Sequence, residues 1–197
     1  MSAVEIIGLA ASFSLLAGWR VYACVAIVGL AMHLDLIDPP SNIPSLEALA
    51  NPWVIGVASV GALAEFFADK VMWLDSLWDG IHTFIRPIGG ALLALAIVDA
   101  SDPAWQIVVL LLGGSAALLS HGAKSGTRAL VNTSPEPFSN MAVSSVEDVV
   151  TFAGLGLALA YPGVALVAAV ALIAICVLIV VASWRLIARA RRWIAPG

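Results

Sequence analysis

Charged residues are scarce in this 197-residue chain. They make up 11% of the sequence, whereas hydrophobic residues make up 61%. Soluble domains carry about 25% charged residues, and a soluble fold of this size has too much surface per volume to hide so much apolar area. The composition therefore predicts an all-α, polytopic membrane helical bundle whose first partner is the lipid bilayer. The net charge of −4 gives no sign of nucleic-acid binding.

Familiar chemical signatures are also missing. The two cysteines, Cys24 and Cys176, lie in separate apolar runs and lack the spacing of a metal site or a disulfide framework. The sequence has no phosphate-binding glycine loop, no Gly-x-Ser-x-Gly elbow and no His-Glu-x-x-His pair. We therefore expect no cofactor, and no motif points to catalysis.

Apolar runs are abundant, and they predict about six transmembrane helices in a single domain. A bilayer core needs about 20 apolar residues per helix. The predicted spans are residues 6–32, 53–71, 87–98, 105–131, 141–161 and 164–184. Between the second and third spans, Asp75, Asp79, His82 and Arg86 follow at steps of four, three and four. This spacing predicts a short amphipathic helix, which either lies at the membrane interface or folds back into the bundle.

The distribution of basic residues predicts the orientation of the bundle. Segments 33–52 and 99–104 contain no Lys or Arg. Basic residues instead flank the other connections and crowd the tail; they are Lys70, Arg86, Lys124, Arg128, Arg185, Arg189, Arg191 and Arg192. Because Lys and Arg near helix ends favour the cytoplasmic side, we expect both termini in the cytoplasm, in the inner membrane of a bacterium.

An internal repeat is a further prediction. Gly18-Trp19-Arg20 in the first span is matched by Gly126-Thr127-Arg128 at the end of the fourth. Six spans with such a match suggest a three-plus-three inverted repeat of the kind that many transporters have.

Two polar stripes fall on consecutive spans. The fourth span ends with His121, Lys124, Arg128 and Asn132, and the fifth begins with Asn140, Ser144, Glu147, Asp148 and Thr151. Each set is spaced for one helical face, so we expect a basic stripe to face an acidic one. Two interpretations stay open: an ion-pair network that only locks the two helices, or a polar pocket or ion pathway open to the cytoplasm.

Two charges lie deeper in the apolar runs. Arg20 is near the middle of the first span, and Glu65 lies well inside the second. A charge at a helix centre costs roughly 2.5–3.5 kcal/mol on insertion scales, so we expect Arg20 and Glu65 to form an ion pair with each other. The alternative is a proton or ion route that also includes Asp69, one helical turn after Glu65.

These polar residues resemble a known family. The residues that carry the resemblance are Asp69-Lys70, Asp75, Asp79, Arg86-Pro87, Lys124, Arg128, the string Asn132-Thr-Ser-Pro-Glu-Pro-Phe-Ser-Asn140, Ser144 and Glu147-Asp148. Over about residues 8–160 the chain is similar to the bacterial membrane family named domain of unknown function 4126. The resemblance implies that the two polar clusters belong together, and it implies no activity. Where that family often has a proline two places after the lysine, this chain has Met72.

The leading functional prediction is a small transporter or channel for a charged solute or ion, with a cytoplasm-facing cavity formed by spans two to five. The predicted substrate-binding residues are Lys70, Asp75, Asp79, Arg86, His121, Lys124, Arg128, Asn132, Glu136, Asn140, Glu147 and Asp148. The basic ones suit a small anionic solute, although the carboxylates outnumber them and keep a cation open.

Two alternatives remain. One is an intramembrane enzyme on a lipid-linked phosphate, with His82 or His121 as acid or base and carboxylates holding a divalent metal. The other is a structural scaffold with inert ion pairs. A homo-oligomer is left open.

Overall fold

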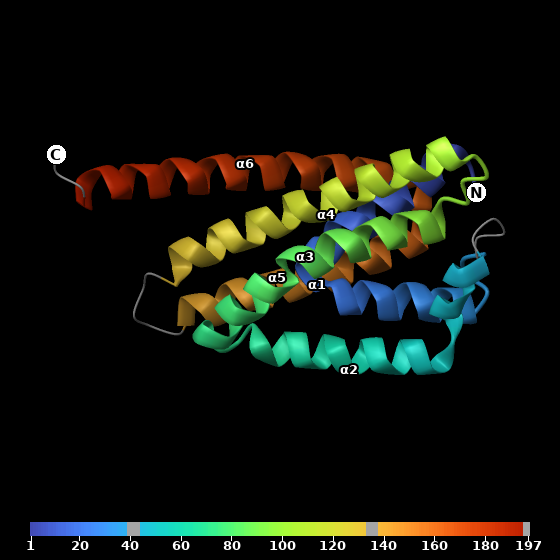
Figure 1. The fold of residues 1–197 in the computed structure, drawn as a ribbon, viewed down its shortest axis with the longest axis horizontal. Coiled ribbons are helices and arrows are strands. Elements are labelled where there is room, and N and C mark those ends of the chain that lie inside the picture. Colours follow the sequence, from blue (N-terminus) through green and yellow to red (C-terminus); the bar gives the residue numbers. More distant parts are fainter. Residues whose placement is uncertain (39–43, 133–137, 195–197) are drawn as a thin grey trace.

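The computed structural model describes residues 1–38, 44–132 and 138–194 (Figure 1). These residues form six α-helices and one 3₁₀ helix, and contain no strand, which confirms the all-α prediction. The elements are α1 (Ala3–His33), η1 (Pro44–Ala50), α2 (Pro52–Ala68), α3 (Met72–Ile97), α4 (Pro103–Val131), α5 (Phe138–Ala160) and α6 (Pro162–Ile194). The predicted site residue Glu136 lies outside the described residues.

Polar residues and prolines mark the helix starts. Ser2 and Glu5 form a reciprocal capping box at α1. The side chains of Asn51 and Asp102 accept hydrogen bonds from the first backbone N–H groups of α2 and α4. A proline follows each of these two caps, at the position where its missing N–H leaves no hydrogen bond unmade. The polar, Pro-containing segments of the sequence are therefore helix boundaries.

Helix α1 bends back on itself at Arg20. This residue has non-helical φ and ψ of −140° and 71°. Residues before position 10 line the same cavity as Ile37 and Asp38, although a straight helix of this length would hold its ends about 45 Å apart. Its two halves, 3–19 and 21–33, therefore form a re-entrant hairpin with Arg20 at the tip, and both ends lie at one end of the bundle (Figure 1).

The bend changes the predicted topology. By length and composition five helices, α1 and α3 to α6, could cross a membrane, and the 17-residue α2 is shorter. Because α1 turns back, the N-terminus and the C-terminus lie at opposite ends of the bundle (Figure 1). The predicted arrangement with both termini on one side counts α1 as a single crossing, and the bend at Arg20 departs from that assumption. A single interrupting residue in an apolar run gave no sign that the run folds back.

Helix α3 unites two predicted segments. The amphipathic stretch 73–86 and the third span 87–98 form one continuous helix with Pro87 inside it. Within residues 73–86 the side chains of Asp75, Asp79, His82 and Arg86 are buried, and apolar ones such as Trp73, Leu77 and Ile81 are exposed. Of the two alternatives, the segment thus folds into the bundle, because its polar face finds partners there. The expected boundary between a short interfacial helix and a short span does not exist.

Small residues bring helices α1, α3 and α4 close together away from these polar groups. A Cβ atom added to Gly90 would lie 2.5 Å from the Ala117 Cβ, and one added to Gly113 would lie 2.8 Å from the Gly90 carbonyl oxygen. The Ser14 hydroxyl donates to the same carbonyl at 2.9 Å. These glycines therefore allow the helix backbones to pack closely.

The inverted repeat stays a prediction. Of its two matched segments, α1 is interrupted at Arg20, whereas α4 continues through Arg128.

Candidate functional site

A continuous network of ion pairs fills the half of the bundle nearest the C-terminus. Within the described part of the chain it joins five basic and six acidic side chains, which are Arg20, Lys70, Arg86, Lys124 and Arg128 with Glu65, Asp69, Asp75, Asp79, Glu147 and Asp148. All of them except Lys70 are buried. The network contains every Lys and Arg that precedes Arg185 in the sequence.

Arg20 connects three elements from the tip of α1. Its guanidinium lies 2.5 Å from Asp69, in the turn between α2 and α3, and 2.5 Å from Asp148 of α5. The predicted ion pair between Arg20 and Glu65 is wrong: Arg20 reaches only the backbone carbonyl of Glu65, at 3.4 Å. The depth estimate assumed a straight first helix, and the bend moves Arg20 toward the α2–α3 turn instead.

Glu65 pairs with Arg86 in the most enclosed part of the network. Arg86 Nη2 lies 2.9 Å from Glu65 Oε1 and Arg86 Nη1 lies 2.7 Å from Asp79 Oδ1, and the side chains of Arg86 and Glu65 are fully buried. The Arg86 guanidinium therefore joins Glu65 of α2 to Asp79, which lies two turns earlier in α3.

The donors around His121 define its protonation. Arg86 Nη1 lies 2.7 Å from His121 Nδ1, and because guanidinium nitrogens only donate, Nδ1 must accept and carry no proton. The proton then belongs on Nε2, which lies 3.0 Å from the Thr83 hydroxyl. This hydroxyl also donates to the Asp79 carbonyl. His121 is thus held neutral, as an acceptor for Arg86.

A second histidine lies beside an aromatic cluster. His82 Nδ1 is 2.7 Å from the Trp78 carbonyl, and His82 Nε2 is 3.1 Å from the Tyr22 hydroxyl. Since a carbonyl only accepts, Nδ1 carries a proton, and in the neutral ring Nε2 then accepts from the Tyr22 hydroxyl. Sequence reasoning missed Tyr22; its only signal was its place two residues after Arg20.

The stripes of α4 and α5 meet through one residue. Arg128 donates to the Asn140 side chain at 2.5 Å and to Glu147 at 2.7 Å. Lys124 instead turns toward Asp69 at 2.6 Å and Asp79 at 3.3 Å. The prediction that the two stripes face each other is therefore correct for Arg128. It is wrong for Lys124, which pairs with Asp69 in the α2–α3 turn instead of with a carboxylate of α5.

Two further predicted residues lie at the edge of the network. Lys70 contacts Asp148 and the Ser144 hydroxyl, both at 2.6 Å. Asn132 lies outside the ion pairs, where its amide donates to the Ser76 hydroxyl at 3.3 Å in an exposed position.

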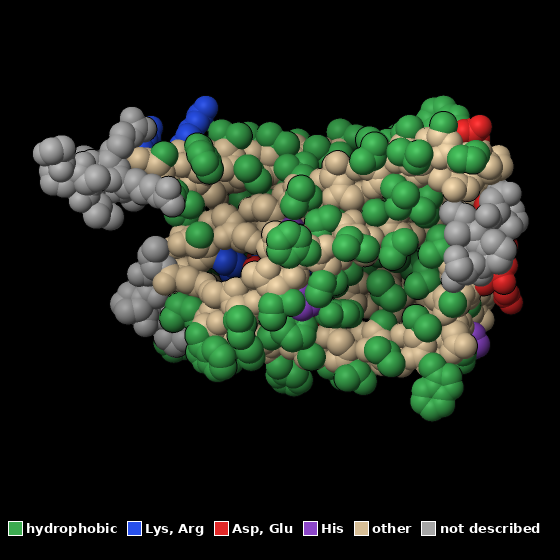
Figure 2. All heavy atoms as spheres, viewed as in Figure 1, with side chains coloured by type: hydrophobic (Ala, Val, Ile, Leu, Met, Phe, Trp, Pro, Cys, Tyr) green, Lys and Arg blue, Asp and Glu red, His purple; other side chains and the backbone are tan. Residues whose placement is uncertain are grey.

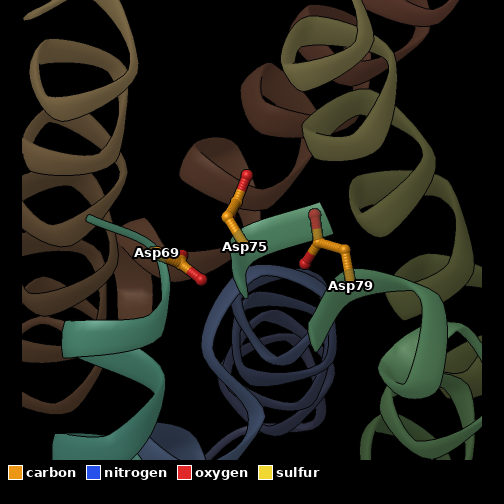
Figure 3. A group of neighbouring side chains, drawn as sticks. All are labelled: Asp69, Asp75 and Asp79. Atoms are coloured by element: carbon orange, nitrogen blue, oxygen red, sulfur yellow. The ribbon is translucent and has the colours of Figure 1, made fainter. Parts of the chain in front are cut away.

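Three aspartates come together between the end of α2 and the first turns of α3. One oxygen each of Asp69, Asp75 and Asp79 lies within 4.8 Å of the others (Figure 3). Asp69 and Asp79 share the Lys124 ammonium. Asp75 differs: it is fully buried, neither of its oxygens has a hydrogen-bond partner among the described residues, and its nearest basic atom is Arg128 Nε at 3.8 Å.

The network is not wholly sealed from the side of the bundle. A cavity of about 320 Å³ with apolar walls from α1, α4, α5 and α6 reaches Lys124 and Glu147. Figure 2 shows, on one face, a hollow among hydrophobic side chains in which atoms of basic and acidic side chains are visible.

The sequence of the chain matches the family described as Domain of unknown function (DUF4126) over residues 7–182. The chain belongs to this family. The resemblance of its polar residues to domain of unknown function 4126 is thereby confirmed. No curated protein and no solved structure matches the chain. The family match covers every residue of the network.

Proposed function

We propose that this multi-pass membrane protein is a transporter or channel for a small ion, which moves through the charge network at the tip of α1. The observation that carries the proposal is the break of α1 at Arg20 inside that network. In a bilayer, backbone that leaves the helical conformation is tolerated only where protein buries it or a wet cavity meets it. Interrupted helices of this kind form the ion sites of many secondary transporters.

The balance of charge favours a cation over an anionic solute. With every group ionised, the six carboxylates exceed the five basic groups by one. An anion would add to this excess of negative charge, whereas a proton or a metal cation would remove it. Buried charge without compensation is strongly disfavoured in low dielectric, so the network favours taking up positive charge.

A scaffold does not need these groups. Replacing buried ion pairs by packed apolar residues is often neutral or stabilising. The same helices already pack through Gly90 and Gly113 without any charge. The energetic cost of the network is therefore explained better by ion passage than by helix locking.

The orientation follows from the tail. Arg185 and Arg189 are exposed, and basic residues beside a helix end favour the cytoplasm. We infer that the C-terminus is cytoplasmic, that the N-terminus lies outside, and that the cytoplasmic membrane is the location. A single cysteine at Ser2 or Asp102 should react with a membrane-impermeant thiol reagent added to intact cells, and one at Gly197 should not. Labelling at Gly197 from outside would reverse the orientation.

Ion flux through the purified protein in liposomes tests the proposal. Liposomes loaded with a pH-sensitive dye should change their internal pH when a gradient of Na⁺ or K⁺ is applied, and protein-free liposomes should not. Arg20→Gln should reduce the flux. Asp38→Asn, an exposed residue after α1, is the control and should leave it unchanged. Absence of flux for all these ions, with product formed from a lipid-linked phosphate, would favour the enzyme alternative.

A further inference from the structure

We propose that Asp75, together with Asp69 and Asp79, binds a monovalent metal cation in exchange for a proton. This inference rests on the proposed function and names the ion class and the residue at which exchange takes place. Carboxylate oxygens suit hard cations of this kind, and the three aspartates bring one oxygen each within 4.8 Å of the others.

The state of Asp75 is the second, independent observation. Its side chain is fully buried, and among the described residues neither oxygen receives a hydrogen bond. The large majority of buried side-chain polar atoms in proteins have a hydrogen-bond partner, and a buried carboxylate that stays ionised without one is costly. A bound proton or a bound cation removes this cost. Asp75 is therefore the group in the network that is built to accept one or the other.

The groups around Asp75 confine the exchange to this carboxylate. Asp69 and Asp79 are already compensated by Lys124. Arg128 approaches Asp75 at 3.8 Å but makes its short contact, at 2.7 Å, with Glu147 of α5. Arg20 of α1 contacts Asp69 and Asp148, each at 2.5 Å. Each neighbouring charge thus has a closer partner than Asp75.

The charge balance selects a monovalent ion. The network lacks one positive charge, so a proton or a monovalent cation makes it neutral. A divalent cation would leave an excess positive charge next to Lys124, whose ammonium lies only 2.6 Å from Asp69 and 3.3 Å from Asp79. It could bind only if Lys124 lost its proton or moved away. When the monovalent cation binds, the proton leaves the Asp75 carboxyl group for solution, and it returns when the cation leaves.

Proton release on cation binding tests this assignment directly. Purified protein in detergent, in weakly buffered solution with a pH-sensitive dye, is mixed with NaCl or KCl, and with choline chloride as the control for ionic strength. The wild-type protein should release protons in proportion to the protein present, with either Na⁺ or K⁺ and not with choline. The Asp75→Asn variant should release none. Asp35→Asn should behave as the wild type, because Asp35 is exposed just after the C-terminal end of α1 and its φ of 56° suits asparagine.

The outcomes separate this inference from the proposed function. Proton release that persists in Asp75→Asn, or release with MgCl₂ or CaCl₂ alone, would overturn the assignment. Asp75-dependent release without flux in liposomes would support the site and count against transport. Flux without any Asp75-dependent release would leave transport standing and overturn the site. If Asp75→Asn does not yield folded protein, Asp75→Glu is the second variant. It keeps the carboxyl group and should still release protons, at a shifted cation affinity. Loss of proton release in folded Asp75→Glu, with Asp35→Asn unaffected, would contradict a cation site at this position.

Discussion

The two halves of this bundle hold the same helices together by different means. Near the N-terminal end, α1, α3 and α4 meet through Ser14, Gly90 and Gly113, whose small side chains let the backbones approach. Near the C-terminal end, α3 and α4 meet through the ion pair of Asp79 with Lys124, and Arg20 of α1 and Lys124 of α4 both contact Asp69 in the α2–α3 turn. The small-residue half shows that close packing alone is sufficient for these helices. The charged half therefore differs from the small-residue half in holding helices together at a cost in desolvation.

The halves should also respond differently to substitution. In the small-residue half a change adds volume where there is no room. In the charge network a change leaves a partner without compensation in low dielectric. Four experiments, taken from the largest expected effect to the smallest, test this contrast.

Asp69→Ala should have the largest effect. Asp69 compensates Arg20 at 2.5 Å and Lys124 at 2.6 Å, and lies 3.8 Å from Arg128. Removing one partner of a buried ion pair costs about 3–5 kcal/mol, because the remaining charge stays buried. Thermal unfolding in detergent would measure this against Asp38→Ala, an exposed control. Equal melting temperatures for the two variants would mean that the network does not stabilise the fold.

Gly90→Ala should destabilise less. The new methyl group would lie 2.5 Å from the Ala117 Cβ, and overpacking of this kind costs about 1–3 kcal/mol. Gly80→Ala is the matched control in the same helix, because a Cβ there meets nothing within 4 Å. It should be neutral or stabilising, since alanine has the higher helix propensity. The same melting assay would compare the two, and a tolerated Gly90→Ala would mean that the small-residue half is loosely packed.

Arg20 and Asp148 should show coupling in a double-mutant cycle. They lie 2.5 Å apart, and contacting residues typically couple by about 0.5–3 kcal/mol. The cycle of Arg20→Gln with Glu65→Gln should give a smaller coupling, because the side chain of Glu65 pairs with Arg86. Stability measured for all variants would decide; a larger coupling to Glu65 than to Asp148 would contradict the arrangement at the tip of α1.

Asp75→Asn should have the smallest effect on stability, or raise it. Asp75 loses no hydrogen bond with the described residues, and the change removes a carboxylate that lies within 4.8 Å of two others. Its melting temperature should equal or exceed that of the wild type. A loss as large as that of Asp69→Ala would show that Asp75 compensates Arg128 in the folded protein.

Much of this site could be predicted from the sequence, because charges in apolar runs are rare and their helical spacing shows which ones share a face. The spacing of Asp75, Asp79 and Arg86 predicted one polar stripe, and α3 buries that stripe. The pairing could not be predicted. Which carboxylate Lys124 meets depends on how α4 packs against the α2–α3 turn, and these segments are far apart in the sequence.

The bend of α1 had no clear signal either. Arg20 is neither glycine nor proline, the residues that usually mark a kink. Hydropathy reports only the length of an apolar run. It does not distinguish a crossing helix from one that turns back, so the prediction of one crossing by residues 6–32 missed the bend at Arg20.

The hairpin of α1 also constrains how the protein is made. Residues near the N-terminus leave the ribosome first, yet α1 is the most enclosed of the long apolar helices. Gly8 packs against Leu166 of α6, and Gly18 packs against Ser120 of α4. These partners are synthesised later than α1 itself. Helix α1 is made before the helices that enclose it, so it can reach its native position only after α4 and α6 have been inserted.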